Sequence, residues 1–178
     1  MQYVAFLRGM NVGGHRITND DLCACFAGMG LEDPWAFLAS GNVVFGAASS
    51  SRAKLAKLVE SGLRDALGYD VPTFLRTAPE LAAIAECAPF AEAVGVVGGK
   101  LQVAMLAKRP SAAQCKRALS VATAQDQLAI VGQELYWLPE GKLTESALDV
   151  KAIDKALGSM TTRTQRTLQR LSKKLLEQ

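Results

Sequence analysis

Glycine, arginine and asparagine gather in two short segments near the N-terminus, Arg8 to Gly14 and Ser40 to Asn42. Glycine permits a positive φ and exposes successive backbone N–H groups as a concave nest, and arginine offers a planar fork of donors that matches phosphate or carboxylate. The pattern therefore predicts a site for a small anionic or phosphate-bearing ligand. Its candidate residues are Arg8, Gly9, Asn11, Gly13, Gly14, Ser40, Gly41 and Asn42.

A purely structural interpretation of the same glycines stays open. Their spacing is neither that of a phosphate loop nor that of the G-x-G-x-x-G dinucleotide turn, and tight turns alone favour glycine. Met10 is the one apolar side chain in the first segment whose position suggests the wall of a ligand site.

The surrounding elements decide whether the two segments meet. Residues 1–77 alternate strand-like and helical patterns in the order strand, helix, strand, strand, helix, strand, which is the order of a ferredoxin-like unit. In such a sheet the first and third strands are antiparallel neighbours, so the loop after one lies beside the turn before the other. The expected elements are Gln2 to Leu7, Thr18 to Gly30, Trp35 to Ala39, Val43 to Phe45, Leu55 to Leu67 and Tyr69 to Leu75.

The second half repeats this order of elements. A capping box from Thr77 to Glu80 begins a connector helix, and residues 78–178 are expected to hold that helix, a second ferredoxin-like subdomain and a basic C-terminal helix. The fold class is thus α+β, with two βαββαβ-type subdomains, antiparallel sheets and an additional C-terminal helix. The expected elements are Leu101 to Ala107, Ser111 to Leu119, Leu128 to Val131, Leu135 to Leu138 and Ala147 to Leu157.

The C-terminal segment suggests nucleic-acid binding as an alternative. Residues 151–178 contain seven Lys or Arg and two acidic residues, and a basic helix face can track phosphates. The aromatic pattern of an RNA-binding sheet is largely missing, because Tyr3 and Phe6 fall on opposite faces and Phe45 is the one aromatic of the third strand. The basic residues expected on one face of the last helix are Arg163, Arg166, Arg170 and Lys174.

Catalytic groups are sparse, and whether the chain is an enzyme stays open. His15 is its one histidine and the one proton-transfer group near the glycine loop, so it would serve an enzyme acting on a phosphorylated substrate. Cys23 and Cys25 are two residues apart on an expected helix, pointing about 200° apart, and cannot share a metal ion. No catalytic residue, metal site or cofactor is assigned.

Composition indicates a globular protein of a reducing compartment. The chain has 178 residues, 49% of them hydrophobic and 21% charged, with a net charge of +3 and four irregularly spaced cysteines. Charged or strongly polar residues interrupt every apolar run before the length of a membrane span, and the first residues carry no signal-peptide pattern. We expect a cytoplasmic protein without membrane partners.

The sequence resembles a known family, the one catalogued as domain of unknown function 1697, over nearly its whole length. The resemblance implies a two-subdomain α+β fold of ferredoxin-like character in a mostly bacterial, cytoplasmic family with no established activity. The two glycine segments match the family pattern best, which favours treating them as one site. After Arg163 the chain departs from the pattern, with Thr164-Gln165 in place of asparagine and tryptophan. The matching segments are Leu7 to Gly14, Ser40 to Phe45, Arg76-Thr77, Glu80-Leu81, Pro89-Phe90, Tyr136-Trp137, Gly141 to Thr144 and Thr161 to Arg163.

Overall fold

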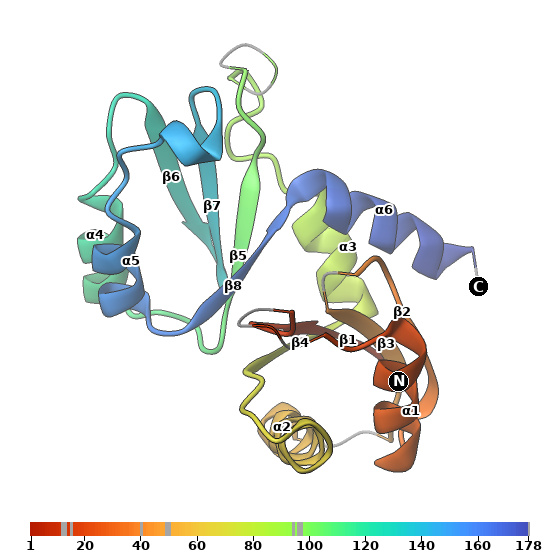
Figure 1. Ribbon diagram of the computed structural model, residues 1–178. Helices are drawn as coiled ribbons and strands as arrows, with labels where there is room; N and C mark the ends of the chain where they lie inside the picture. The colour runs from red at the N-terminus through yellow and green to blue at the C-terminus, as the bar shows by residue number, and fades with distance from the viewer. Residues whose placement is uncertain are drawn as a thin grey trace. The chain divides into compact units, whose positions relative to one another are not determined.

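The computed structural model describes residues 1–11, 14, 16–39, 41–48, 51–93, 95 and 98–177. They divide into two compact units, Met1–Leu81 and Ala82–Gln178. Each unit contains one four-stranded antiparallel sheet with its helices (Figure 1). The α+β fold class with two similar units is therefore confirmed.

The first unit has the ferredoxin-like strand order β2-β3-β1-β4. In register, Phe6 of the first strand lies opposite Asn42 of the third. The unit comprises β1 (Gln2–Leu7), α1 (Asn19–Gly28), β2 (Glu32–Ala36), β3 (Asn42–Gly46), α2 (Arg52–Leu67) and β4 (Thr73–Thr77).

One face of this sheet packs against α1 and α2, and the core follows from the periodicity of the sequence. Alternate residues of β1 point to the helices, and α2 contributes residues spaced by four. The rings of Tyr3 and Phe45 stack in this core with centroids 5.9 Å apart. The main core residues are Tyr3, Ala5, Leu7, Leu22, Phe26, Val43, Phe45, Leu55, Val59, Leu63 and Leu75.

Two strands of the first unit are offset along the chain from their expected ranges, β2 toward the N-terminus and β4 toward the C-terminus. Strand β2 ends at Ala36, and Leu38, which was expected inside it, has a left-handed φ of 58° that breaks the extended backbone. Strand β4 begins after Pro72, because proline has no N–H to donate to a neighbouring strand. The expected helix signals agree better, since Thr18 accepts a bond from the Asp21 N–H and Gly68, with φ of 79°, ends α2.

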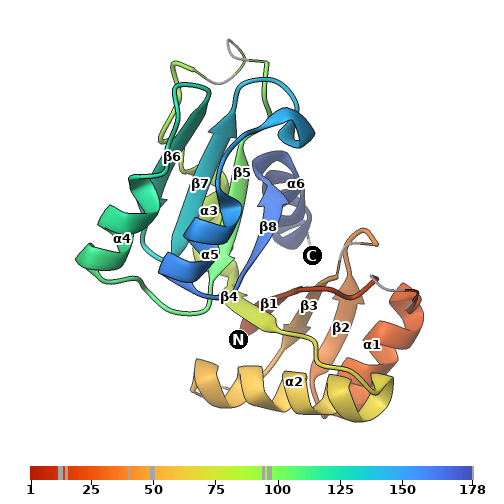
Figure 2. The same cartoon turned by 60° about the vertical axis from the view of Figure 1, so that its left-hand side comes forward.

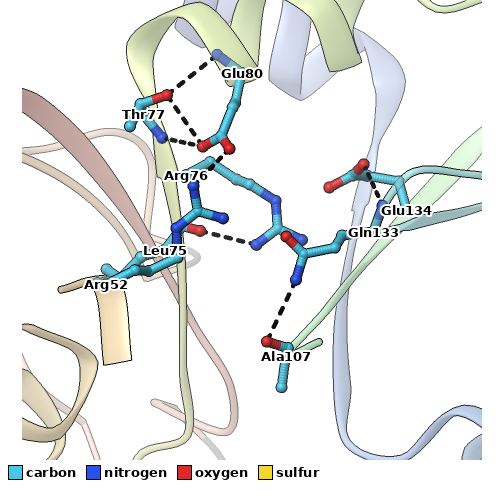
Figure 3. Close-up of polar contacts among 8 residues, drawn as sticks. All are labelled: Arg52, Leu75, Arg76, Thr77, Glu80, Ala107, Gln133 and Glu134. Carbon is cyan, nitrogen blue, oxygen red and sulfur yellow. Dashed lines mark hydrogen bonds and ion pairs between the residues drawn. The ribbon is translucent and has the colours of Figure 1, made fainter. Parts of the chain in front are cut away.

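Helix α3 (Ala78–Glu86) follows β4 directly and begins with the expected capping box. The Glu80 carboxylate accepts bonds from the Thr77 N–H at 2.8 Å and the Thr77 hydroxyl at 3.0 Å, while its other oxygen pairs with Arg52 at 2.5 Å (Figure 3). Burial raises the pKa of Glu80, but the Thr77 and Arg52 contacts outweigh it and hold that pKa below its usual value.

The second unit has the equivalent strand order β6-β7-β5-β8. Helices α4 and α5 cover one face and form a core with Ala104, Leu106 and Leu135. On the other side of the sheet, the Tyr136 hydroxyl donates to the carbonyl of Ile84 at 3.4 Å. The unit comprises β5 (Gln102–Leu106), α4 (Ala112–Leu119), β6 (Asp126–Val131), β7 (Glu134–Pro139), the 3-10 helix η1 (Leu143–Glu145), α5 (Val150–Leu157), β8 (Met160–Thr164) and α6 (Gln165–Leu176) (Figure 2).

The expected position of Arg163 on the last helix is wrong. Arg163 belongs to β8, opposite Val103 of β5, and α6 starts at Gln165. The physical reason is local: β-branched threonines favour a strand, and the Thr164 hydroxyl accepts a bond from the Thr167 N–H at 3.2 Å, which makes Thr164 the N-cap.

The two units share a structural feature that a comparison of their amino-acid sequences does not make obvious. Each ends in a strand whose penultimate residue is an arginine, followed by a threonine and a helix, α3 in one case and α6 in the other. Arg76 Nη1 donates to the carbonyl of Leu75 at 2.8 Å (Figure 3), and Arg163 Nη1 donates to the carbonyl of Thr162 at the same distance. The repeat thus extends to seven elements, β-α-β-β-α-β-α.

Among the helices that the structure describes, none combines the length and the hydrophobicity needed to cross a bilayer.

Candidate functional site

The loop after β1 and the turn before β3 meet at one end of the first sheet, as the strand order requires. The Leu7 N–H donates to the carbonyl of Gly41 at 2.8 Å, which continues the β1–β3 pairing into the turn. On the other side of β1, the Arg8 N–H donates to the carbonyl of Pro72 at 3.0 Å. The backbone at the start of the loop is thereby fixed between two neighbouring segments.

Asn11 connects the loop to the β2–β3 hairpin. Its side-chain amide donates to the carbonyl of Ala39 at 3.1 Å, and its carbonyl oxygen accepts from the Ile17 N–H at 3.4 Å. Asn11 itself is exposed to solvent. Its carboxamide therefore positions the two segments relative to each other at the surface of the unit.

Gly41 is required by both conformation and space. Its φ is 69°, and a Cβ atom there would lie 3.0 Å from the Met10 side chain and 3.1 Å from that of Leu7. Met10 is only 4% exposed and belongs to the hydrophobic core, so its expected role as a ligand wall is wrong. Burial of an apolar side chain in the core is the stronger driving force here.

Tyr69 also belongs to this region, although no sequence pattern predicts its position there. Its hydroxyl donates to the carbonyl of Met10 at 3.0 Å, across 59 positions of sequence. A lone tyrosine after a helix-ending glycine carries no motif, and only the strand order brings it to the loop. It anchors the middle of the loop to the unit.

The remaining predicted site residues differ in their surroundings. Arg8 and Gly9 are exposed, and Gly9 and Gly14 have φ of 75° and 88°, a backbone conformation that glycine adopts without strain. Asn42 is fully buried, and its side-chain amide donates to the carbonyl of Phe37 at 2.9 Å, so it closes the hairpin from inside. Three predicted residues lie outside the described part of the chain, namely Gly13, His15 and Ser40.

The four basic residues expected on one face of the last helix do not all lie on that helix. Arg163 is partly buried in β8, donates to the Thr161 hydroxyl at 2.9 Å, and has its pKa lowered to about 10 by desolvation. Arg166, Arg170 and Lys174 lie on α6 at a spacing of four and are exposed. The expected basic face is therefore reduced from four residues to three.

The thiols are poorly suited to nucleophilic chemistry. Burial raises the pKa of Cys23 and of Cys25, and the carboxylates of Asp20 and Asp21 respectively raise them further. The four cysteines are free and half-buried. Within the described ranges, no three His, Cys, Asp or Glu side chains lie close enough to hold a metal ion.

Comparison with known proteins finds a solved structure of similar fold and a matching family. A solved structure, that of the conserved bacterial protein SP0830 from Streptococcus pneumoniae, is similar with a TM-score of 0.78 and 17% sequence identity, over 98% of each chain. At that identity the likeness concerns the fold alone. No curated protein matches the chain at a significant level. The model of the family described as "Protein of unknown function (DUF1697)" matches residues 1–136, most of the sequence, and the chain belongs to that family.

Proposed function

We propose that the first unit binds a small anionic ligand, such as one that carries a phosphate group, at a loop-and-turn site formed by Arg8, Gly9, Asn11, Gly14 and Gly41. The observation that carries the proposal is the pair of hydrogen bonds from Leu7 to Gly41 and from Asn11 to Ala39. They hold two glycine-containing segments together beside an exposed arginine.

The chemistry of the proposal rests on preorganisation. A guanidinium forms charge-assisted hydrogen bonds with phosphate or carboxylate oxygens, and a backbone already fixed by its neighbours loses little entropy on binding. In this arrangement Arg8 supplies the charge and the glycine amides supply further donors. Asn42 acts from inside the hairpin by fixing the turn that precedes β3.

A thermal-unfolding screen tests the proposal. A ligand that binds the folded protein raises its melting temperature, so the screen would use inorganic phosphate, pyrophosphate, adenosine monophosphate and glucose 6-phosphate. The Arg8→Gln variant should show a clearly smaller shift. Arg109→Gln is the matched control, because Arg109 is exposed in the loop after β5, the equivalent loop of the second unit, and should keep the full shift.

Nucleic-acid binding is the second candidate, and the spacing of Arg166, Arg170 and Lys174 on α6 favours it. It predicts binding to a single-stranded oligonucleotide that weakens steeply with salt. The buried stack of Tyr3 and Phe45 argues against base stacking on the first sheet. The enzyme alternative depends on His15, which lies outside the described residues, and His15→Ala tests it through turnover of a phosphorylated substrate.

A further inference from the structure

The second unit contains a cavity of about 320 Å³ that shares no residue with the loop-and-turn site. Its lining residues belong to the segment that leads into β5, to the end of β7 and to the segment that contains η1. The start of β5 and the end of β7 lie at the same end of the sheet (Figure 2). The volume is near the lower limit of ordinary small-molecule pockets. The cavity is lined by Gly98, Lys100, Gln102, Pro139, Gly141, Lys142, Leu143 and Thr144.

The cavity lies between two chain segments, residues 98–102 and residues 139–144, which approach each other closely at Gly99. A Cβ atom on Gly99 would lie 1.7 Å from the carbonyl oxygen of Pro139 and 3.3 Å from that of Gly141, so only glycine allows this approach of backbone to backbone. Next to it, the side-chain amide of Gln102 donates to the carbonyl of Lys100 at 2.8 Å, and Gln102 is only 7% exposed. The segment that carries Lys100 is therefore fixed in place.

A buried carboxylate fixes the other segment of the cavity, residues 139–144. Asp126 is 1% exposed and accepts hydrogen bonds from Trp137 Nε1 at 2.8 Å, the Ser146 hydroxyl at 2.7 Å and the Thr123 hydroxyl at 3.0 Å. The Glu140 N–H also donates to the carbonyl of Gln125 at 2.6 Å. Because Ser146 and Glu140 flank the lining segment, these contacts keep its backbone in position.

The lining combines positive charge with apolar surface. Lys100 and Lys142 are both exposed at the cavity, and Lys142 is 3.6 Å from the Glu145 carboxylate in a solvent-exposed pair that a ligand can replace at small cost. Leu143 keeps 43% of its surface exposed at the same place. Two ammonium groups beside Leu143 and Pro139 suit a compact anion with an apolar part.

We propose that this cavity binds a small organic anion, with its carboxylate or phosphate group between Lys100 and Lys142 and its apolar part against Leu143 and Pro139. The site needs no contribution from the first unit. Its ligand chemistry differs from that of the loop-and-turn site by the requirement for an apolar body. Inorganic phosphate alone should bind it more weakly than an aryl phosphate or aryl carboxylate.

Amide chemical shifts of the full-length protein test the proposal, with phenyl phosphate, benzoate and inorganic phosphate as separate probes. We expect saturable shifts of the Gly98, Gly99 and Gly141 amide signals with at least one aryl anion. A larger response to phenyl phosphate than to benzoate would assign a phosphate group, and the reverse a carboxylate. Signals of Gly9, Gly14 and Gly41 report the loop-and-turn site in the same spectra, so the two proposals fail or succeed separately.

Charge-matched variants decide whether the lysines carry the binding. Lys100→Gln combined with Lys142→Gln should weaken the Kd by about tenfold, since two charge contacts are removed. The control combines Lys116→Gln with Lys151→Gln, two exposed lysines of the same unit outside the cavity, and should leave the Kd unchanged. Equal weakening in both pairs, or no saturable shift at the three glycines, would overturn the proposal.

Discussion

The side-chain amide of Asn11 donates a hydrogen bond to the carbonyl of Ala39, and this contact ties the loop after β1 to the hairpin that precedes β3. Replacing Asn11 with alanine removes this bond and the one from the Ile17 N–H. We expect a loss of about 1 kcal/mol in the free energy of unfolding, measured by urea titration. Asn19→Ala is the control, because the described part of the chain gives that exposed side chain no hydrogen bond; equal losses in the two variants would contradict the role of Asn11.

Gly41 should tolerate a side chain worse than other glycines of positive φ. Alanine at position 41 meets both the left-handed backbone and the side chains of Met10 and Leu7, so we expect a loss of about 3 kcal/mol. Gly14 has a φ of 88° with open space around it, and Gly14→Ala should cost only about 1 kcal/mol. Thermal unfolding of the two variants gives the difference, and a milder effect at position 41 would refute the close approach.

Asp126 should be the most sensitive polar residue of the second unit. Asp126→Ala removes the buried acceptor that three side-chain donors share, two of which, Trp137 and Ser146, are half-buried, and we expect a loss of about 3 kcal/mol. Thr123→Val removes one of the three bonds and should cost about 1 kcal/mol. Chemical denaturation with Trp137 fluorescence as the signal measures both, since the Trp137 indole donates to Asp126. Equal losses of unfolding free energy in the two variants would contradict the role of Asp126 as the shared acceptor of three hydrogen bonds.

Because the pKa of Glu80 is lowered in the folded protein, the free energy of unfolding should depend on pH in a specific way. Its folded-state pKa lies below the ordinary value of 4.5, so the unfolded chain takes up a proton first as the pH falls. The contribution of Glu80 is therefore complete above that ordinary value and is lost as the pH drops through the folded-state pKa. Because the Arg52–Glu80 pair is more than one third exposed, the effect is small.

The Glu80→Gln variant isolates this contribution. The difference in unfolding free energy between the natural protein and the variant should be constant near neutral pH and shrink between about pH 5 and pH 3. Parallel urea titrations over that range measure it. A difference that grows toward acid pH would contradict a lowered folded-state pKa of Glu80.

Most of the helical structure could be predicted from the sequence because local signals specify it. Thr18, Ser111 and Gly68 act at the helix ends where the pattern placed them. Strand β8 was missed, because only Thr161 of its five residues is buried and no apolar alternation marks it. Its assignment depends on pairing with β5, which is a long-range contact that no local pattern records.

The candidate site was predictable to the extent that strand order determines it. The meeting of the two glycine segments follows from the antiparallel pairing of β1 with β3. The burial of Asn42 and the anchoring of the loop by Tyr69 could not be predicted, because a polar residue is placed inside by its specific partner and not by its type. The cavity had a weak signal in the glycine–lysine pairs Gly99-Lys100 and Gly141-Lys142.

Calorimetric titration with pyrophosphate tests the central claim most directly, with the natural protein, Arg8→Gln and Arg109→Gln side by side. We expect saturable binding to the natural protein and to Arg109→Gln, with a Kd about tenfold weaker for Arg8→Gln because a charge-assisted contact is lost. Pyrophosphate binding that is the same in all three proteins, or no heat of binding in any of them, would contradict an anion site at the loop after β1.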